Sequence, residues 1–170
     1  LNGLNATQKR IDSKWLYDAT GSQLFDTITE LAEYYPTRIE LGILRQNASR
    51  LTEFVTNGAA LVELGSGSST KTRALLNVLT GLQSYVPIDI SADHLQDAAD
   101  HVAREYRHLD VIPVVADFTC EITLSSNLSA APHTLFFPGS TIGHFAVAVA
   151  THLLRRTLKM ALFPAVTRGV

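Results

Sequence analysis

Hydrophobic residues recur every three or four positions in the first 57 residues, a spacing that predicts amphipathic helices. The apolar face of a first helix would consist of Leu24, Phe25, Ile28 and Leu31. A second helix, over about 38–54, would bury Ile39, Ile43, Leu44, Leu51 and Phe54. Thr20 or Ser22 can cap the first helix, and Pro36 breaks the chain between the two. We therefore expect an N-terminal helical segment over residues 1–57.

After residue 57 the pattern changes to short apolar runs separated by stretches with helical spacing. The apolar runs, which predict strands, cover 59–64, 84–89, 110–116 and 134–137. Helical spacing covers 70–80, 92–107 and 145–160. Strands that alternate with helices predict an α/β fold with a parallel sheet and right-handed crossovers. Residues 58–170 would form this core.

The composition narrows the class of protein without identifying it. The 170 residues carry a net charge of −2, which does not indicate a nucleic acid or an anionic membrane as partner. No apolar run approaches the roughly 20 residues that span a bilayer. A single cysteine, Cys120, fits a reducing compartment, so we expect a cytoplasmic protein. The chain does not begin with Met, and we expect the native start to precede Leu1.

The stretch from Leu61 to Thr72 joins the first predicted strand to a helix through a glycine turn. Gly65 and Gly67 lack a Cβ, so the backbone can bend sharply there and approach a ligand closely. The hydroxyl residues that follow can cap the helix and leave backbone N–H groups for a polar ligand. This arrangement is typical of a cofactor loop at the carboxyl end of a parallel strand.

Acidic residues end the next two predicted strands. Asp89 follows Gly65 by 24 positions, where a carboxylate can accept hydrogen bonds from a ribose diol. Asp117 can accept a hydrogen bond from the amine of a purine, with Phe118 beside the ring. Each feature alone has an ordinary explanation as a loop or a helix cap. Together, at three consecutive strand ends, they predict a cofactor that contains adenosine.

Two such cofactors compete, NAD and S-adenosylmethionine. A dinucleotide loop requires a third glycine, and the corresponding position is Thr70. Glu63, two residues before the first glycine, is typical of enzymes that use S-adenosylmethionine. The loop therefore favours S-adenosylmethionine. The six histidines have no metal-ligand spacing, so we expect no metal site.

Six sequence blocks, in order, resemble the L-histidine Nα-methyltransferases of ergothioneine biosynthesis over about residues 6–160. The blocks are 13–26, 33–38, 63–72, 85–91, 116–119 and 136–143. The resemblance implies a Rossmann-like class I methyltransferase core with strand order 3-2-1-4. It also implies transfer of three methyl groups from S-adenosylmethionine to the α-amine of histidine, which gives hercynine.

The resemblance also implies roles for individual residues. The cofactor would be held by Gly65, Ser66, Gly67, Lys71, Asp89, Asp117 and Phe118. Tyr35 would reach the carboxylate of the amino acid, and Tyr17 would lie near the reacting amine, although its ordinary pKa makes it a poor base. Gly139 and Thr141 would line the space between cofactor and substrate. Residues 1–57 would thus lie on the substrate side.

Two departures from the family pattern matter. His144 stands where the family has an Asn that helps to hold the substrate, so another amine, such as a tryptophan derivative, is an alternative acceptor. The family continues well beyond the point where this chain stops matching, after Leu158, so we expect a truncated member. A non-catalytic fragment that binds the cofactor is then a further alternative. The fourth strand would be an exposed edge, which predicts marginal stability or self-association.

Overall fold

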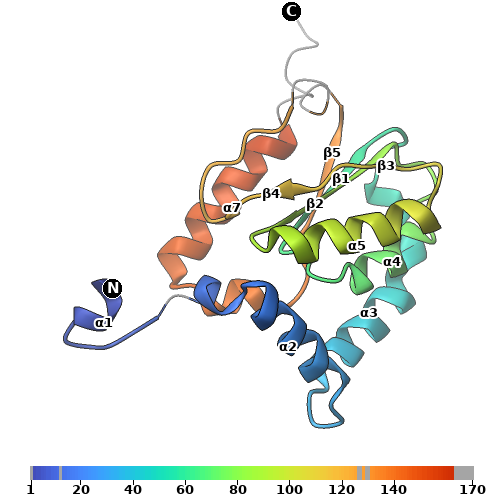
Figure 1. The fold of residues 1–170 in the computed structure, drawn as a ribbon. Coiled ribbons are helices and arrows are strands. Elements are labelled where there is room, and N and C mark those ends of the chain that lie inside the picture. Colours follow the sequence, from blue (N-terminus) through green and yellow to red (C-terminus); the bar gives the residue numbers. More distant parts are fainter. Residues whose placement is uncertain (1, 12, 126–127, 129–130, 163–170) are drawn as a thin grey trace, which may run out of the picture.

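A parallel sheet lies at the centre of the molecule, and helices pack around it (Figure 1). The computed structural model describes residues 2–11, 13–125, 128 and 131–162. The strands are β1 (Ala60–Leu64), β2 (Ser84–Asp89), β3 (Asp110–Val111), β4 (Val114–Val115) and β5 (His133–Phe136). Their order is β3-β2-β1-β5, with β4 also paired to β2, and all pairings are parallel. The predicted α/β fold and strand order are confirmed, with one difference in the third strand.

The third predicted strand, 110–116, is divided into β3 and β4. Both pieces pair with β2 in one continuous register, since Ser84 lies opposite Asp110 and Ile88 lies opposite Val114. In this register Pro87 faces position 113, which is also a proline. Neither residue has a backbone N–H to donate, so the ladder is interrupted there.

Helices cover both faces of the sheet. The core elements are α4 (Thr70–Leu76), α5 (Ala92–Glu105), η3 (Ser140–His144) and α7 (Val147–Leu162). Side chains of β1 alternate between two cores, because successive residues of a strand point to opposite faces. Leu61 packs with α4 and α5, whereas Val62 and Leu64 pack with Leu153 of α7. All five residues of β1 are buried, as expected for a central parallel strand.

The N-terminal segment is helical, as predicted. It contains α1 (Asn2–Asn5), η1 (Ser13–Leu16), α2 (Ala19–Glu30), α3 (Pro36–Leu51) and η2 (Thr52–Phe54). The predicted cap of α2 is wrong: Asp18 caps it, and its carboxylate accepts a hydrogen bond from the Gly21 N–H at 2.7 Å. Pro36 begins α3, because its missing N–H costs nothing in a first turn.

The predicted inward face of α2 is wrong except at Phe25. Leu24, Ile28 and Leu31 are exposed. A more polar face is turned inward, and it consists of Phe25 together with Ser22, Asp26 and Thr29. None of the described helices is both long and apolar enough to cross a membrane.

Candidate functional site

A cleft of about 240 Å³ lies at the carboxyl ends of the strands, where open α/β sheets bind ligands. Its walls come from the loops after β1, β2, β4 and β5, and from η1, α2 and the start of α3. Predicted site residues on these walls are Tyr17, Gly65, Ser66, Gly67, Lys71, Asp89, Asp117, Phe118, Gly139, Thr141 and His144. The structure thus brings together residues that are far apart in the sequence.

The glycine loop has the backbone conformation that its sequence predicts. Gly65 and Gly67 have φ angles of +69° and +50°, in the region that favours glycine. A Cβ at Gly65 would lie 3.3 Å from the ring of Phe118, a tight contact that would require the ring to shift by a few tenths of an ångström. Ser69 has a φ of +55°, which is strained for a residue with a side chain.

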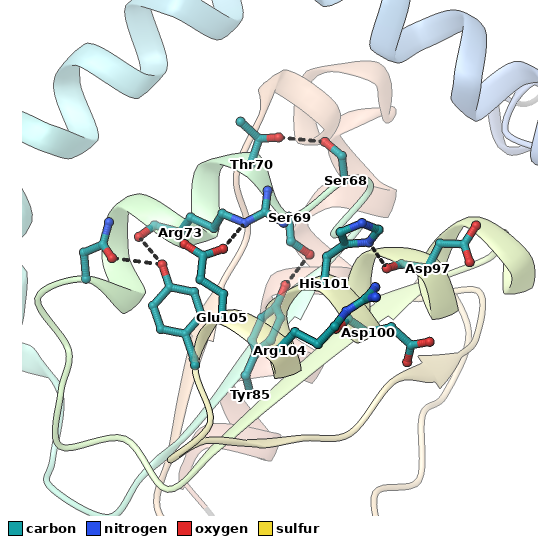
Figure 2. Close-up of polar contacts among 12 residues, drawn as sticks. Ser68, Ser69, Thr70, Arg73, Tyr85, Asp97, Asp100, His101, Arg104 and Glu105 are labelled. Atoms are coloured by element: carbon teal, nitrogen blue, oxygen red, sulfur yellow. Dashed lines mark hydrogen bonds and ion pairs between the residues drawn. The ribbon is translucent and has the colours of Figure 1, made fainter.

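A buried hydrogen-bond network holds Ser69 in this conformation. The Ser69 and Tyr85 hydroxyls are 2.9 Å apart, and a dashed line marks this hydrogen bond in Figure 2. The Tyr85 hydroxyl and the Thr72 hydroxyl both donate to the Glu63 carboxylate, which is 1% exposed. The network therefore connects the glycine loop and α4, through Ser69 and Thr72, to β1 and β2.

Burial raises the pKa of Glu63 from 4.5 to about 7, because water no longer stabilises the charged form. Hydrogen bonds from Thr72 and Tyr85 and the charge of Lys71 lower this pKa, without cancelling the effect of burial. Glu63 therefore changes its charge near neutral pH, directly beneath the loop.

Asp89 at the end of β2 connects two backbone segments. Its Oδ2 accepts a hydrogen bond from the Gly67 N–H at 3.0 Å, and its Oδ1 accepts one from the Ser91 N–H at 3.1 Å. A carboxylate has about four acceptor positions, so Asp89 can still accept from a diol.

Asp117 links the cleft to the N-terminal segment. Its Oδ2 accepts from the Lys14 ammonium at 2.8 Å, and its Oδ1 accepts from the Thr119 N–H at 2.9 Å. Burial raises the pKa of Asp117, but the hydrogen bonds from Lys14 and Thr119 outweigh burial and leave the pKa lowered. Asp117 is therefore a firmly ionised acceptor. Lys14 brings η1 against the loop after β4.

Aromatic residues form the wall on the side of Tyr17. The ring of Phe25 lies between those of Tyr17 and Tyr34, with 5.9 Å between centroids in each edge-to-face pair. Burial, then the nearby Tyr34 and Asp89, raises the pKa of Tyr17. Its hydroxyl therefore stays protonated at neutral pH and can donate a hydrogen bond rather than take a proton.

The structure does not bring Tyr35 to the cleft. Its side chain is 65% exposed, and its backbone precedes the first residue of α3. The neighbouring Tyr34 lines the cleft instead. In a pair of adjacent tyrosines, the sequence does not show which one turns inward.

Sequence reasoning missed several residues of the cleft, among them Lys14, Asp26, Glu40 and His94. The His94 Nε2 and Asp26 Oδ2 atoms are 2.9 Å apart, and this hydrogen bond joins α5 to α2. Glu40 pairs with Lys71 at 2.6 Å. These residues come from helices, where a polar residue is ordinarily part of a solvated face, so no signal singled them out.

The cleft also contains polar atoms that fit a polar ligand. Within the described residues, the Ser66 hydroxyl and the Nδ1 atom of His94 are buried and have no hydrogen-bond partner. Buried polar groups are ordinarily paired, so these two are suited to contact a bound molecule. No group of His, Cys, Asp and Glu side chains in the described part of the chain has the arrangement of a metal site.

Comparisons with known proteins identify relatives of this chain. The family model described as histidine-specific methyltransferase, SAM-dependent, matches residues 1–166. The histidine N-alpha-methyltransferase of Mycobacterium tuberculosis is 42% identical over 147 residues, which cover 84% of this chain and 44% of that protein. The one of Mycolicibacterium smegmatis is 40% identical over 161 residues, covering 89% and 47%.

Among solved structures, the plantazolicin methyltransferase in complex with SAH superposes with a TM-score of 0.53. It is 15% identical, and the match covers 88% of this chain and 52% of that one, so it supports the fold alone. The chain spans less than half the length of the two mycobacterial relatives. Its sequence and fold nevertheless make it a member of the histidine-specific, S-adenosylmethionine-dependent methyltransferase family.

Proposed function

We propose that this protein transfers methyl groups from S-adenosylmethionine to the α-amine of an amino acid, L-histidine. The product would be hercynine, in the pathway to ergothioneine. The observation that carries the proposal is the shared cleft, in which the glycine loop and the carboxylates of Asp89 and Asp117 face Tyr17 and the turn after β5. We expect the reaction to take place in the cytoplasm, which fits the free cysteine, Cys120.

The cleft residues can pair with the polar groups of S-adenosylmethionine. Asp89 would accept from the ribose hydroxyls and Asp117 from the purine amine, beside the ring of Phe118. The Ser66 hydroxyl, which is buried without a partner in the described chain, would gain one. Lys71 would face the carboxylate, which is the cofactor's only anionic group.

The cofactor, when bound, supplies a sulfonium methyl group to the amine nitrogen, and the electrons of the broken carbon–sulfur bond remain on sulfur. The protein's contribution is alignment, which can lower a barrier by about 7–11 kcal/mol. The hydroxyl of Tyr17, which its raised pKa keeps protonated, would accept a hydrogen bond from an N–H of the neutral amine and so leave the nitrogen lone pair free for the methyl group. The rings of Phe25 and Tyr34 would shield that wall from water.

His144 favours a second candidate acceptor. It is an exposed residue at the rim of the cleft, where the family pattern has an Asn. A different amine, such as a tryptophan derivative, is therefore the alternative substrate. The chain spans less than half the length of its two mycobacterial relatives, and a third candidate function is binding of the cofactor without turnover.

Calorimetry on the 170-residue chain with S-adenosylhomocysteine, with and without L-histidine, tests the proposal. We expect binding of S-adenosylhomocysteine and a further heat with histidine. Mass spectrometry after incubation with S-adenosylmethionine then reports mono-, di- and trimethylated products. Methylation of a tryptophan derivative but not of histidine would select the second candidate. Binding without turnover of any amine would select the third, and no binding would refute all three.

A further inference from the structure

Glu40 lies at the point where three distant segments of the chain meet. It belongs to α3, and its Oε2 forms an ion pair with the Lys71 ammonium of α4 at 2.6 Å. Its Oε1 accepts a hydrogen bond from the Gly139 N–H, in the turn after β5, at 2.5 Å. The two oxygens of one carboxylate thus hold two different walls of the cleft.

The contact between these walls is close. Gly139 has a φ of +78°, and a Cβ built on it would lie 3.1 Å from the Lys71 Nζ atom. The Lys71 and Glu40 side chains are 22% and 30% exposed, so the pair is partly shielded from water. A lysine side chain is long and flexible, and the pairing with Glu40 restricts where its ammonium can lie.

An ammonium has three N–H donors, and the ion pair with Glu40 leaves donors for a ligand. We propose that Glu40 is a positioning residue: it holds the Lys71 ammonium toward the carboxylate of the cofactor and fixes the Gly139 turn beside it. This inference rests on the proposed function. It adds that the N-terminal helices take part in binding the methionine end of the cofactor, through α3.

Two probes separate this role from a general effect on folding. S-adenosylhomocysteine has the carboxylate, whereas 5′-methylthioadenosine has the same nucleoside without the amino-acid end. For Glu40→Gln we expect binding of S-adenosylhomocysteine to weaken by about three- to tenfold, the range for loss of one ordinary hydrogen bond, because Glu40 acts through Lys71. Binding of 5′-methylthioadenosine should change less than about twofold. Glu30→Gln, an exposed site on α2, is the control with the same charge change.

A double-mutant cycle tests the route through Lys71. Lys71→Met should weaken binding of S-adenosylhomocysteine as well, and adding Glu40→Gln to it should cause no further loss. Three results would overturn the inference. Glu40→Gln could weaken the binding of both probes equally, or it could leave the binding of S-adenosylhomocysteine unchanged. It could also tighten that binding, because a negative charge has been removed. A wild-type chain that binds neither probe would instead refute the proposed function, so the two failures are distinguishable.

Discussion

The buried carboxyl of Glu63 makes the stability of this protein depend on pH in a predictable direction. Its pKa is raised from 4.5 to about 7 by burial, so the folded chain holds the proton more tightly than the unfolded chain does. The proton therefore adds to stability in full below pH 4.5. This contribution is lost as the pH rises through about 7.

The size of the effect follows from the same two pKa values. At pH 5 the bound proton contributes about 2–3 kcal/mol to the free energy of unfolding, and at pH 8 almost nothing. The folded protein should therefore lose about 2–3 kcal/mol from Glu63 alone between pH 5 and pH 8. Other groups titrate over this range too, so the effect must be isolated by substitution.

The contribution of Glu63 is isolated by urea unfolding of the wild type and of Glu63→Gln at pH 5, 6, 7 and 8. Gln keeps an oxygen that can accept from Thr72 and Tyr85 but cannot ionise. The stability of the wild type relative to Glu63→Gln should fall by about 2–3 kcal/mol from pH 5 to 8, which is a change of roughly 1–1.5 M between the two midpoints at an m-value of about 2 kcal/mol/M.

The matched control is Glu53→Gln, at an exposed residue of η2. The difference between wild type and this variant should be the same at every pH. A difference in free energy of unfolding between wild type and Glu63→Gln that stays constant from pH 5 to 8 would show that the pKa of Glu63 is not raised. A stability of the wild type that increases with pH relative to Glu63→Gln would also contradict the raised pKa. It would mean that the hydrogen bonds and Lys71 stabilise the charged form more than burial disfavours it.

Three further predictions test the cleft and the sheet. Gly65→Ala should lower the free energy of unfolding by about 1–2 kcal/mol, from its positive φ and its contact with Phe118, and weaken binding of S-adenosylhomocysteine in calorimetry. Gly42→Ala, a helical site with open space, should not lower stability and serves as the control. Tyr34→Phe should weaken the binding of histidine more than Tyr35→Phe does, because only the former removes a hydroxyl from the cleft wall; the reverse order would support the role that the resemblance assigns to Tyr35. Within the described residues β5 pairs with β1 alone, so the chain should self-associate in sedimentation experiments, and a monodisperse monomer that unfolds cooperatively would contradict this.

Features with a strong local cause could be predicted from the sequence. The buried strands β1 and β2 are short apolar runs, and the glycine loop requires positive φ angles that few other residues adopt. The division of the third strand was missed because it depends on two prolines, Pro87 and Pro113, that become neighbours only once the register of the sheet is known. Such pairings are not visible along one chain.

The orientation of α2 shows why helical periodicity was insufficient. Periodicity shows that two faces differ, and the usual rule turns the apolar face inward. Here the neighbour is a polar cleft rather than a core, so Asp26 reaches His94 across it while Leu24 and Ile28 are exposed. Pairings such as Glu40 with Lys71 follow from this tertiary arrangement and leave no pattern in the sequence.

Two contacts across the cleft join the two predicted parts of the chain. The sequence suggested a substrate-side segment, 1–57, and a separate cofactor core, 58–170. Lys14 from the first part donates to Asp117, and Glu40 holds Lys71, so each end of the proposed cofactor site depends on a residue of the helical segment. A carboxylate that already accepts from Lys14 and Thr119 has fewer positions left for a purine amine. We therefore expect the affinity for the cofactor to depend on how the N-terminal segment packs against the core.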